Sequence, residues 1–212
     1  MNKQKIVFYC KNCGNEHSKW HGQCKYCKEW NSLKEKKVSS IRFKSKTEFG
    51  NYFKKENIPL KMSEIDSENE IRMIVKDDEW NRVLGGGLVP GSVCLISGEP
   101  GIGKSTLLLQ ISMKFDKKVL YVSGEESQRQ IKVRSERIGK GVGSTFILSE
   151  TETENIFEHI KEINPEIIII DSIQTLHSKM IDGSPGSVTQ VRECSGELIK
   201  YAKNTGSAIL LI

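Results

Sequence analysis

Eight residues near the middle of the chain have the types and the order needed to bind phosphate groups. Residues 98–105 read Gly-Glu-Pro-Gly-Ile-Gly-Lys-Ser and fit the pattern G-x-x-x-x-G-K-[ST]. Glycines let the backbone curl so that successive N–H groups point at phosphate oxygens, and the helix that follows adds its positive dipole end. We expect Lys104 to reach the β- and γ-phosphates and Ser105 to ligate Mg²⁺.

Acidic residues after two apolar strands complete this expected site. Asp171 ends the run 167–170, and the carboxyl ends of parallel strands face the ligand crevice, so we expect Asp171 to hold Mg²⁺ from a strand next to the phosphate loop. Glu125 and Glu126 follow the strand at 118–122 and are candidates for orienting the attacking water. Spacing does not choose between them, since the helix dipole also favours glutamate there. The residues assigned to ATP are Gly98, Glu99, Pro100, Gly101, Ile102, Gly103, Lys104, Ser105, Thr106 and Asp171.

Four of the six cysteines form two C-x-x-C pairs, Cys10 with Cys13 and Cys24 with Cys27, ten residues apart. Four thiolates make a closed tetrahedral site of the structural kind, and so short a module needs the metal in order to fold. We expect Zn²⁺, with an iron–sulfur cluster or a redox dithiol pair as alternatives. Three aromatic residues of the module, at positions 20, 26 and 30, are expected to cover this site or to meet a partner.

Apolar runs and amphipathic stretches alternate from about residue 63 onward, which predicts an α/β fold with a mainly parallel central sheet. Periodicity and glycine or proline breaks set the expected elements. The expected strands are 92–97, 118–122, 145–148, 167–170 and 208–212. The expected helices are 104–115, 126–137, 153–163 and 188–204. We expect the lone Cys94 to be buried in the first of these strands.

Composition and charge divide the chain into three expected parts: a four-cysteine finger at 6–31, a basic linker at 32–62 and a P-loop core at 63–212. Residues 1–62 hold 15 Lys and Arg against 5 Asp and Glu, whereas the rest holds 17 against 22. Such a basic arm indicates either a segment that binds a polyanionic partner or a solvated lysine-rich linker. No apolar run approaches the roughly 20 residues of a membrane span, and a secretory signal is not visible, so we expect a cytoplasmic protein.

With these motifs in place, the chain resembles the RadA (Sms) family of bacterial DNA repair and recombination proteins. FYCKNCGNEHSKWHGQCKYCKEWNSL resembles the family's zinc finger, and WNRVLGGGLVPGSVCLISGEPGIGKSTLLLQ resembles the start of its RecA-like ATPase core. VLYVSGEES, IIIIDSIQT and PGSVTQVRECSGELIKYAK resemble later core motifs and are more specific to the family than the P-loop.

The resemblance implies a DNA-dependent ATPase that processes recombination intermediates and promotes branch migration after RecA-mediated strand exchange. Its expected cofactors are ATP, Mg²⁺ and Zn²⁺, and its expected partners are single-stranded and branched DNA, RecA and further copies in a ring, often a hexamer. The resemblance also favours Glu125 over Glu126 as the residue that activates water. It further implies that residues 174–190 form a mobile loop facing DNA, with His177, Lys179 and Arg192 as candidate contacts or as ordinary surface.

Three functions from different classes remain open at this point. The first is the ATP-driven motor on single-stranded DNA, and the second is a nucleotide-gated DNA-binding or adaptor protein without translocation. The third is a small-molecule kinase, for which no acceptor motif is visible and in which the four-cysteine finger has no role. The chain stops within the apolar run at 208–212, and members of the family continue beyond it, so we expect a fragment with impaired turnover.

Overall fold

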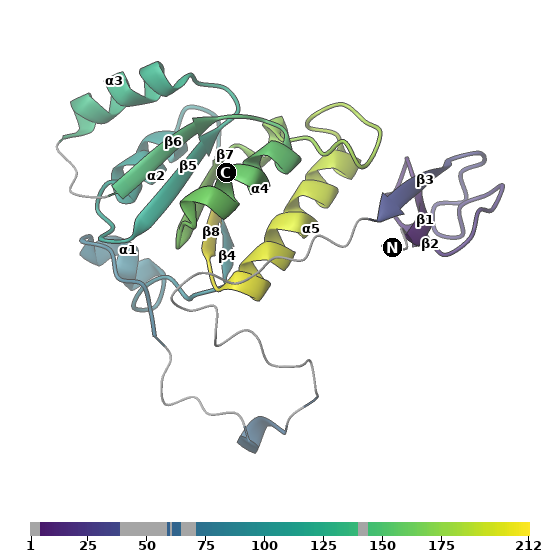
Figure 1. Ribbon diagram of the computed structural model, residues 1–212, viewed down its shortest axis with the longest axis horizontal. Coiled ribbons are helices and arrows are strands. Elements are labelled where there is room, and N and C mark those ends of the chain that lie inside the picture. The colour runs from purple at the N-terminus through teal and green to yellow at the C-terminus, as the bar shows by residue number, and fades with distance from the viewer. Residues whose placement is uncertain (1–4, 39–58, 60, 65–70, 140–143) are drawn as a thin grey trace.

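The computed structural model describes residues 5–38, 59, 61–64, 71–139 and 144–212. It has a three-stranded sheet near the N-terminus and a five-stranded sheet covered by helices, as Figure 1 shows. Between them a short 3₁₀ helix, η1 (Met62–Glu64), and the helix α1 (Asp78–Val83) lead into the larger sheet. None of the helices in the described ranges is long and apolar enough to cross a membrane.

The small sheet belongs to the four-cysteine finger and has the order β2-β1-β3. Its strands are β1 (Lys5–Cys10), β2 (Glu16–His17) and β3 (Leu33–Val38). β3 pairs antiparallel with the whole of β1, so the sheet extends into the range expected to be linker. The sequence of β3, LKEKKV, has four charged residues in a row, which is typical of a linker, so the local pattern does not reveal that this segment is a paired strand. Most of the remaining linker lies outside the described residues.

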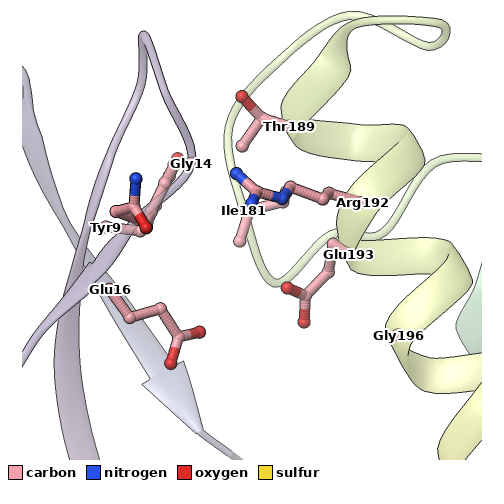
Figure 2. A pocket seen from close by; sticks show the side chains of 9 residues that line it. Tyr9, Gly14, Glu16, Ile181, Thr189, Arg192, Glu193 and Gly196 are labelled. Carbon is pink, nitrogen blue, oxygen red and sulfur yellow. The ribbon is translucent and has the colours of Figure 1, made fainter. Parts of the chain in front are cut away.

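The finger lies beside the last helix of the core, α5 (Val188–Thr205). Figure 2 shows the finger strand that carries Tyr9 facing the first turns of this helix. The Tyr9 hydroxyl accepts a hydrogen bond of 3.1 Å from the backbone N–H of Asp182, and the Lys34 ammonium group lies 3.1 Å from the Asp182 carboxylate. The two parts therefore meet through polar contacts close to the metal-binding end of β1.

The large sheet has the order β4-β8-β7-β5-β6, and all of its strand pairs are parallel. The strands are β4 (Val93–Leu95), β5 (Lys118–Ser123), β6 (Ser144–Ser149), β7 (Ile167–Asp171) and β8 (Ala208–Leu211). This confirms the predicted α/β fold with a parallel sheet. The expectation that Asp171 lies on the strand next to the phosphate loop is wrong, because β8 separates β7 from β4.

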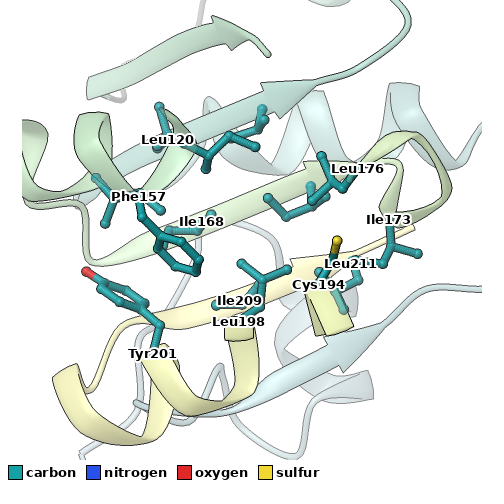
Figure 3. Close-up of a cluster of buried hydrophobic side chains, with 14 of the residues drawn as sticks. Leu120, Phe157, Ile168, Ile173, Leu176, Cys194, Leu198, Tyr201, Ile209 and Leu211 are labelled. Atoms are coloured by element: carbon teal, nitrogen blue, oxygen red, sulfur yellow. The ribbon is translucent and has the colours of Figure 1, made fainter. Parts of the chain in front are cut away.

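Helices cover both faces of this sheet and bury two separate cores. On one face pack α2 (Lys104–Ser112) and α3 (Gln128–Ile138), and on the other pack α4 (Thr153–Ile163) and α5. Figure 3 shows the second core, in which Phe157 and Tyr201 from the two helices lie over Ile168 and Ile209 of the sheet. Strands buried on both faces explain why the run 167–170 is uniformly apolar.

The expected helix at 153–163 is confirmed at both ends, whereas one other expected helix and one expected strand are shorter in the structure than predicted. The helix that begins at Lys104 ends at Ser112 rather than at residue 115, and the Ser112 hydroxyl donates to the Leu109 carbonyl within the last turn. The first strand covers 93–95 rather than 92–97. Since this strand is an edge of the sheet, Cys94 is only half-buried, and the expectation of a buried thiol is wrong.

Candidate nucleotide and metal sites

The loop between β4 and α2 has the backbone shape that the phosphate-binding pattern requires. Gly101 and Gly103 have φ angles of 77° and 99°, in the left-handed region that favours glycine, and Gly103 caps the start of α2. The Lys104 ammonium group folds over the loop and donates hydrogen bonds of 2.8 Å to the carbonyls of Gly98 and Glu99. The loop therefore holds a cation at the N-terminal end of a helix, where a phosphate group would also be attracted.

Ser105 and Asp171 meet across the carboxyl edge of the sheet although their elements are not neighbours. The Ser105 hydroxyl, in the first turn of α2, donates a hydrogen bond of 3.0 Å to one carboxylate oxygen of Asp171. The α2 helix crosses over the sheet after the loop, which brings its first turn above the end of β7. A hydroxyl and a carboxylate at this distance are oxygen ligands of the kind that Mg²⁺ prefers, so the residues fit that ion.

Two further residues, Tyr121 and Arg134, hold the Asp171 carboxylate, and neither belongs to a sequence motif that would predict this role. The Tyr121 hydroxyl donates a 2.5 Å hydrogen bond to the other Asp171 oxygen. Burial raises the pKa of Tyr121 far above its usual range and the Asp171 charge adds to this, so the phenol stays protonated and remains a donor. The Arg134 guanidinium lies 3.4 Å from the Tyr121 hydroxyl and 3.9 Å from the Asp171 carboxylate.

The two glutamates after β5 have different surroundings. Glu126 donates its backbone N–H to the Ser123 hydroxyl at 3.1 Å, and its carboxylate lies 2.9 Å from Arg134. The second Glu126 carboxylate oxygen is buried and has no hydrogen-bond partner within the described ranges. Glu125 is exposed at the carboxyl edge of the sheet. Glu126 is therefore engaged within the protein, while the assignment of Glu125 to water activation stays a prediction.

The four cysteine sulfur atoms of the finger lie within 4.8 Å of one another. The sulfurs of Cys10 and Cys27 are 3.5 Å apart, and those of Cys13 and Cys24 are 3.6 Å apart. A tetrahedral ion with Zn–S bonds of about 2.3 Å requires sulfur separations of about 3.8 Å, so these side chains fit Zn²⁺. Burial opposes ionisation of Cys10, but hydrogen bonds with the Ser32 side chain and nearby backbone amides outweigh it and lower the thiol pKa to about 6.

The aromatic residues of the finger do not cover these sulfur atoms. Trp20, Tyr26 and Trp30 are exposed, so the expectation that they shield the metal is wrong. The buried His17 takes that place, with its Nε2 atom 3.5 Å from the Cys24 sulfur. The histidine fills the space beside the four sulfurs because β2 turns it inward, whereas the three larger aromatic rings project from loops.

The segment expected to be a mobile loop at 174–190 follows a defined path held by Gln190. The Gln190 side chain is buried, accepts a 2.8 Å hydrogen bond from the Ser178 backbone N–H and donates at 3.1 Å to the Ile181 carbonyl. The segment begins with a 3₁₀ helix, η2 (Ile173–Thr175), directly after β7. The segment therefore connects the strand that carries Asp171 to the first turn of α5.

The candidate DNA contacts in this region have protein partners. The Lys179 ammonium group lies 2.6 Å from the Glu152 carboxylate, and Arg192 donates a short hydrogen bond to the Cys13 carbonyl of the finger. The backbone of His177 is bonded to α4, and its Nδ1 atom is buried without a hydrogen-bond partner in the described part of the chain. Arg192 also lines a cleft of about 300 Å³ between finger and core, shown in Figure 2.

Comparisons with known proteins identify both parts of the chain. The family described as "AAA domain" matches residues 62–212, and the family described as "Rubredoxin metal binding domain" matches residues 8–35. The proteins named DNA repair protein RadA from Halalkalibacterium halodurans and Bacillus subtilis are 44% and 43% identical to this chain over its whole length. The protein of that name from Chlamydia trachomatis is 43% identical over 95% of the chain.

These matches cover 47%, 47% and 44% of the three relatives, so the chain spans about half the length of the curated relatives it matches. The matched families agree with the two sites described above, a nucleotide-binding domain and a zinc-binding module of four cysteines.

Proposed function

This chain belongs to the family of AAA domains and is homologous over its whole length to DNA repair protein RadA, and from that premise we propose that it carries the ATPase core of a DNA-dependent motor. The proposed motor processes recombination intermediates in DNA repair and promotes branch migration after RecA-mediated strand exchange. The observation that supports the proposal most directly is the 3.0 Å contact between Ser105 and Asp171 beside the Lys104 loop.

In this proposal the backbone of residues 98–106 cradles the phosphates of ATP. Lys104 exchanges the two loop carbonyls for β- and γ-phosphate oxygens, which is favourable because a phosphate carries more negative charge than a carbonyl. Ser105 and Asp171 hold Mg²⁺, which when bound neutralises charge that develops on the phosphates. Tyr121 keeps the Asp171 carboxylate turned toward Ser105.

Glu125 has the proposed role of orienting and polarising the attacking water. Its position is one residue after Gly124, whose backbone N–H donates at 3.0 Å to the Asp171 carbonyl, so the turn is fixed to the end of β7. Its exposed carboxylate is available to a water molecule, whereas that of Glu126 is paired with Arg134. A base in this position accepts a proton as the water attacks in line with the γ-phosphate.

The proposed partners are single-stranded and branched DNA, RecA and further copies of the protein in a ring. The proposed division of the chain is a finger at 6–31, a linker at 32–62 and the ATPase core at 63–212, with the sheet of the finger continuing to Val38. Because the relatives are about twice as long, ring assembly is proposed for the complete protein.

ATP turnover by this chain, with and without single-stranded DNA, tests the proposal. We expect turnover that DNA stimulates, and we expect Lys104→Ala to abolish it while the zinc content of the finger is retained. Lys132→Ala is the matched control, because this lysine on α3 is exposed and pairs with Glu136 one turn away. DNA-stimulated turnover that survives Lys104→Ala would exclude this site as its source.

The second candidate is a nucleotide-gated DNA-binding or adaptor protein without translocation. The observation that favours it is the defined path of residues 174–190, since a segment attached both to the Asp171 strand and to the finger can report nucleotide binding without motion along DNA. Strand displacement by the complete protein separates the two: ATP turnover without displacement of a paired strand favours the adaptor.

A further inference from the structure

Three large aromatic side chains of the finger are exposed to a degree that is unusual for their type. Trp20 is 58% exposed, Tyr26 is 67% exposed and Trp30 is 68% exposed. Exposed tryptophan is costly in water and commonly marks a surface that binds something. All three lie within eleven residues of one another in the sequence, around the second cysteine pair.

Contacts between residues of the finger connect the loops that carry these rings. The Trp30 ring lies against Gly22, where an added Cβ would be 3.7 Å from the ring. The Tyr26 ring meets the edge of the His17 ring at a centroid distance of 5.7 Å, and His17 in turn lies 6.0 Å from His21, the residue after Trp20. The three rings therefore project from adjoining loops.

Lysines alternate with the aromatic residues along this part of the sequence. Lys19, Lys25 and Lys28 are exposed, and within the described part of the chain none of their ammonium groups forms an ion pair. The acidic residue among them is Glu29, which follows Lys28. We define the aromatic–lysine face as Trp20, Tyr26, Trp30, Lys19, Lys25 and Lys28. It offers flat apolar rings beside positive charge.

Among the residues that the structure describes, the contacts of the core with the finger leave this face free. Contacts between finger and core use the Tyr9 hydroxyl, the Lys34 ammonium group and the carbonyls of Lys11 and Cys13, all from β1, β3 or the first cysteine pair. Figure 2 shows that side of the finger, where the strand with Tyr9 and the turn with Gly14 face α5. The second cysteine pair and its aromatic neighbours take no part in these contacts, so the docked finger still presents the face to a ligand.

We propose that the aromatic–lysine face binds single-stranded DNA, with unpaired bases stacked on the rings and phosphates beside the lysines. The inference rests on the proposed function, which it deepens by naming a site where the DNA is held. Stacking requires bases that are not paired, which favours a single strand over a duplex. Lysine is depleted in protein–protein interfaces, so a nucleic acid fits the charge better than a protein does.

Tryptophan fluorescence gives a direct test with the zinc-loaded full chain. The chain has three tryptophans, at positions 20, 30 and 80, and Trp80→Phe leaves the two on the face as the only reporters. We expect a short oligothymidylate to quench this fluorescence and a duplex of the same length to quench it much less. If Trp80→Phe disturbs folding, fluorescence anisotropy of a labelled oligothymidylate with the unsubstituted chain gives the affinity instead.

Substitutions on the face should then weaken binding by amounts typical of stacking. We expect Trp20→Ala and Trp30→Ala each to lower the affinity for oligothymidylate about tenfold or more, and Trp20→Phe to retain most of it. Lys25→Ala should reduce the salt dependence of binding, because one phosphate contact is lost. Lys132→Ala, on α3 and far along the chain, is the control that should change neither. Unchanged affinity in both alanine variants at full zinc content would overturn the proposal.

The same variants separate this inference from the proposed ATPase. Lys104→Ala removes turnover but should leave oligothymidylate quenching intact. DNA-stimulated turnover without quenching would overturn the inference and leave the ATPase proposal standing. Oligothymidylate binding, measured by anisotropy, that Trp30→Ala weakens would support the inference whether or not this chain shows DNA-stimulated turnover, whereas absence of such turnover in the complete protein would count against the motor. If the same variants no longer bound a protein that the unsubstituted chain binds, while their affinity for DNA was unchanged, the face would be assigned to a protein partner and the inference overturned.

Discussion

The Tyr121 hydroxyl controls how the Asp171 carboxylate is presented at the edge of the sheet. It holds one carboxylate oxygen at 2.5 Å while the Ser105 hydroxyl holds the other at 3.0 Å. A carboxylate restrained at both oxygens by groups from two different elements has little freedom to rotate. An ion held by Ser105 and Asp171 would therefore meet ligands that are already oriented.

Tyr121→Phe should lower ATP turnover about tenfold when Mg²⁺ is limiting and less when Mg²⁺ is saturating. A hydrogen bond to a charged group contributes about 1.5 kcal/mol or more, and this corresponds to roughly a tenfold effect. Turnover measured as a function of Mg²⁺ concentration checks the prediction. Tyr201→Phe, another buried tyrosine on the opposite face of the sheet, is the matched control. An equal loss at every Mg²⁺ concentration would show that Tyr121 acts elsewhere.

Residues that belong to a contiguous pattern could be predicted, and residues that depend on topology could not. The loop at 98–105 and the four cysteines are recognisable from their spacing in the sequence, and the structure brings the residues of each set together. Tyr121 lies in an apolar strand and Arg134 on a polar helix, which are ordinary positions for both types. Their meeting at Asp171 depends on β5 being next to β7 and on α3 packing over that pair.

At the scale of elements, β5 and η2 approach each other so closely that only glycine fits at position 124. A Cβ at Gly124 would lie 2.0 Å from the Thr175 hydroxyl oxygen and 2.5 Å from its Cβ. This approach fixes the turn that carries Glu125 against the segment that follows Asp171. The glycine is needed here for space, since its φ angle is not in the left-handed region.

Gly124→Ala should reduce the free energy of unfolding by about 1–3 kcal/mol, because the added methyl group forces the two segments apart. Chemical denaturation measures this loss, and ATP turnover should fall with it. Thr175→Gly should recover part of the loss in the double variant, even though it removes the hydrogen bond from Thr175 to the Ser172 carbonyl.

The control for this prediction is Gly196→Ala within α5, where no atom lies within 4 Å of the added Cβ. That change should be neutral or stabilising, because alanine favours helix more than glycine does. Equal destabilisation by both alanine variants would mean that the loss of glycine, and not the contact with Thr175, is responsible.

The α1 helix is fixed to the core through its N-cap. The Asp77 carboxylate accepts a 3.0 Å hydrogen bond from the backbone N–H of Trp80, and its other oxygen lies 2.7 Å from the Lys114 ammonium group after α2. The hydrogen bond with Lys114 and the capping bond lower the pKa of Asp77 below its usual value near 3.8. The charged form of Asp77 therefore stabilises the folded chain.

Asp77→Asn should lower the melting temperature at neutral pH, and the difference from the parent should shrink as the pH falls below about 4. A lowered folded-state pKa gives stability that is present above the ordinary pKa and is lost as the carboxylate is protonated. Asparagine can still cap the helix, so Asp77→Ala should be the more destabilised variant. Thermal melting across this pH range checks both statements, and a difference independent of pH would contradict the role of the ion pair.

The alternation of helices and strands was predictable, but the order of the strands was not. Periodicity tells which faces are buried, and this was enough for the helix at 153–163 and for the apolar run 167–170. The position of β8 between β4 and β7 depends on where each crossover returns, and a local pattern does not contain that information. The four consecutive charged residues of β3 likewise give no local sign that this segment pairs with β1.

At the scale of the whole molecule, the metal site of the finger and the segment after β7 are joined by direct contacts. Arg192 of α5 donates to the carbonyl of Cys13, which is one of the four cysteines. Asp182 bonds to the Tyr9 hydroxyl through its backbone and to Lys34 through its carboxylate. Because so small a finger is expected to depend on its metal to fold, we expect these contacts to be lost when the metal is removed.

Removal of zinc by a chelator should therefore increase hydrogen exchange at residues 178–192 as well as in the finger. The Asp182 N–H loses its acceptor when Tyr9 is released, while the amides of β7 stay protected within the sheet. Arg192→Ala with zinc bound should produce the same change more weakly. Lys200→Ala, an exposed lysine two turns further along α5, should leave exchange unchanged. Hydrogen exchange measured by mass spectrometry tests this prediction. Faster exchange in the finger without any change in exchange at residues 178–192 would show that the two parts are independent.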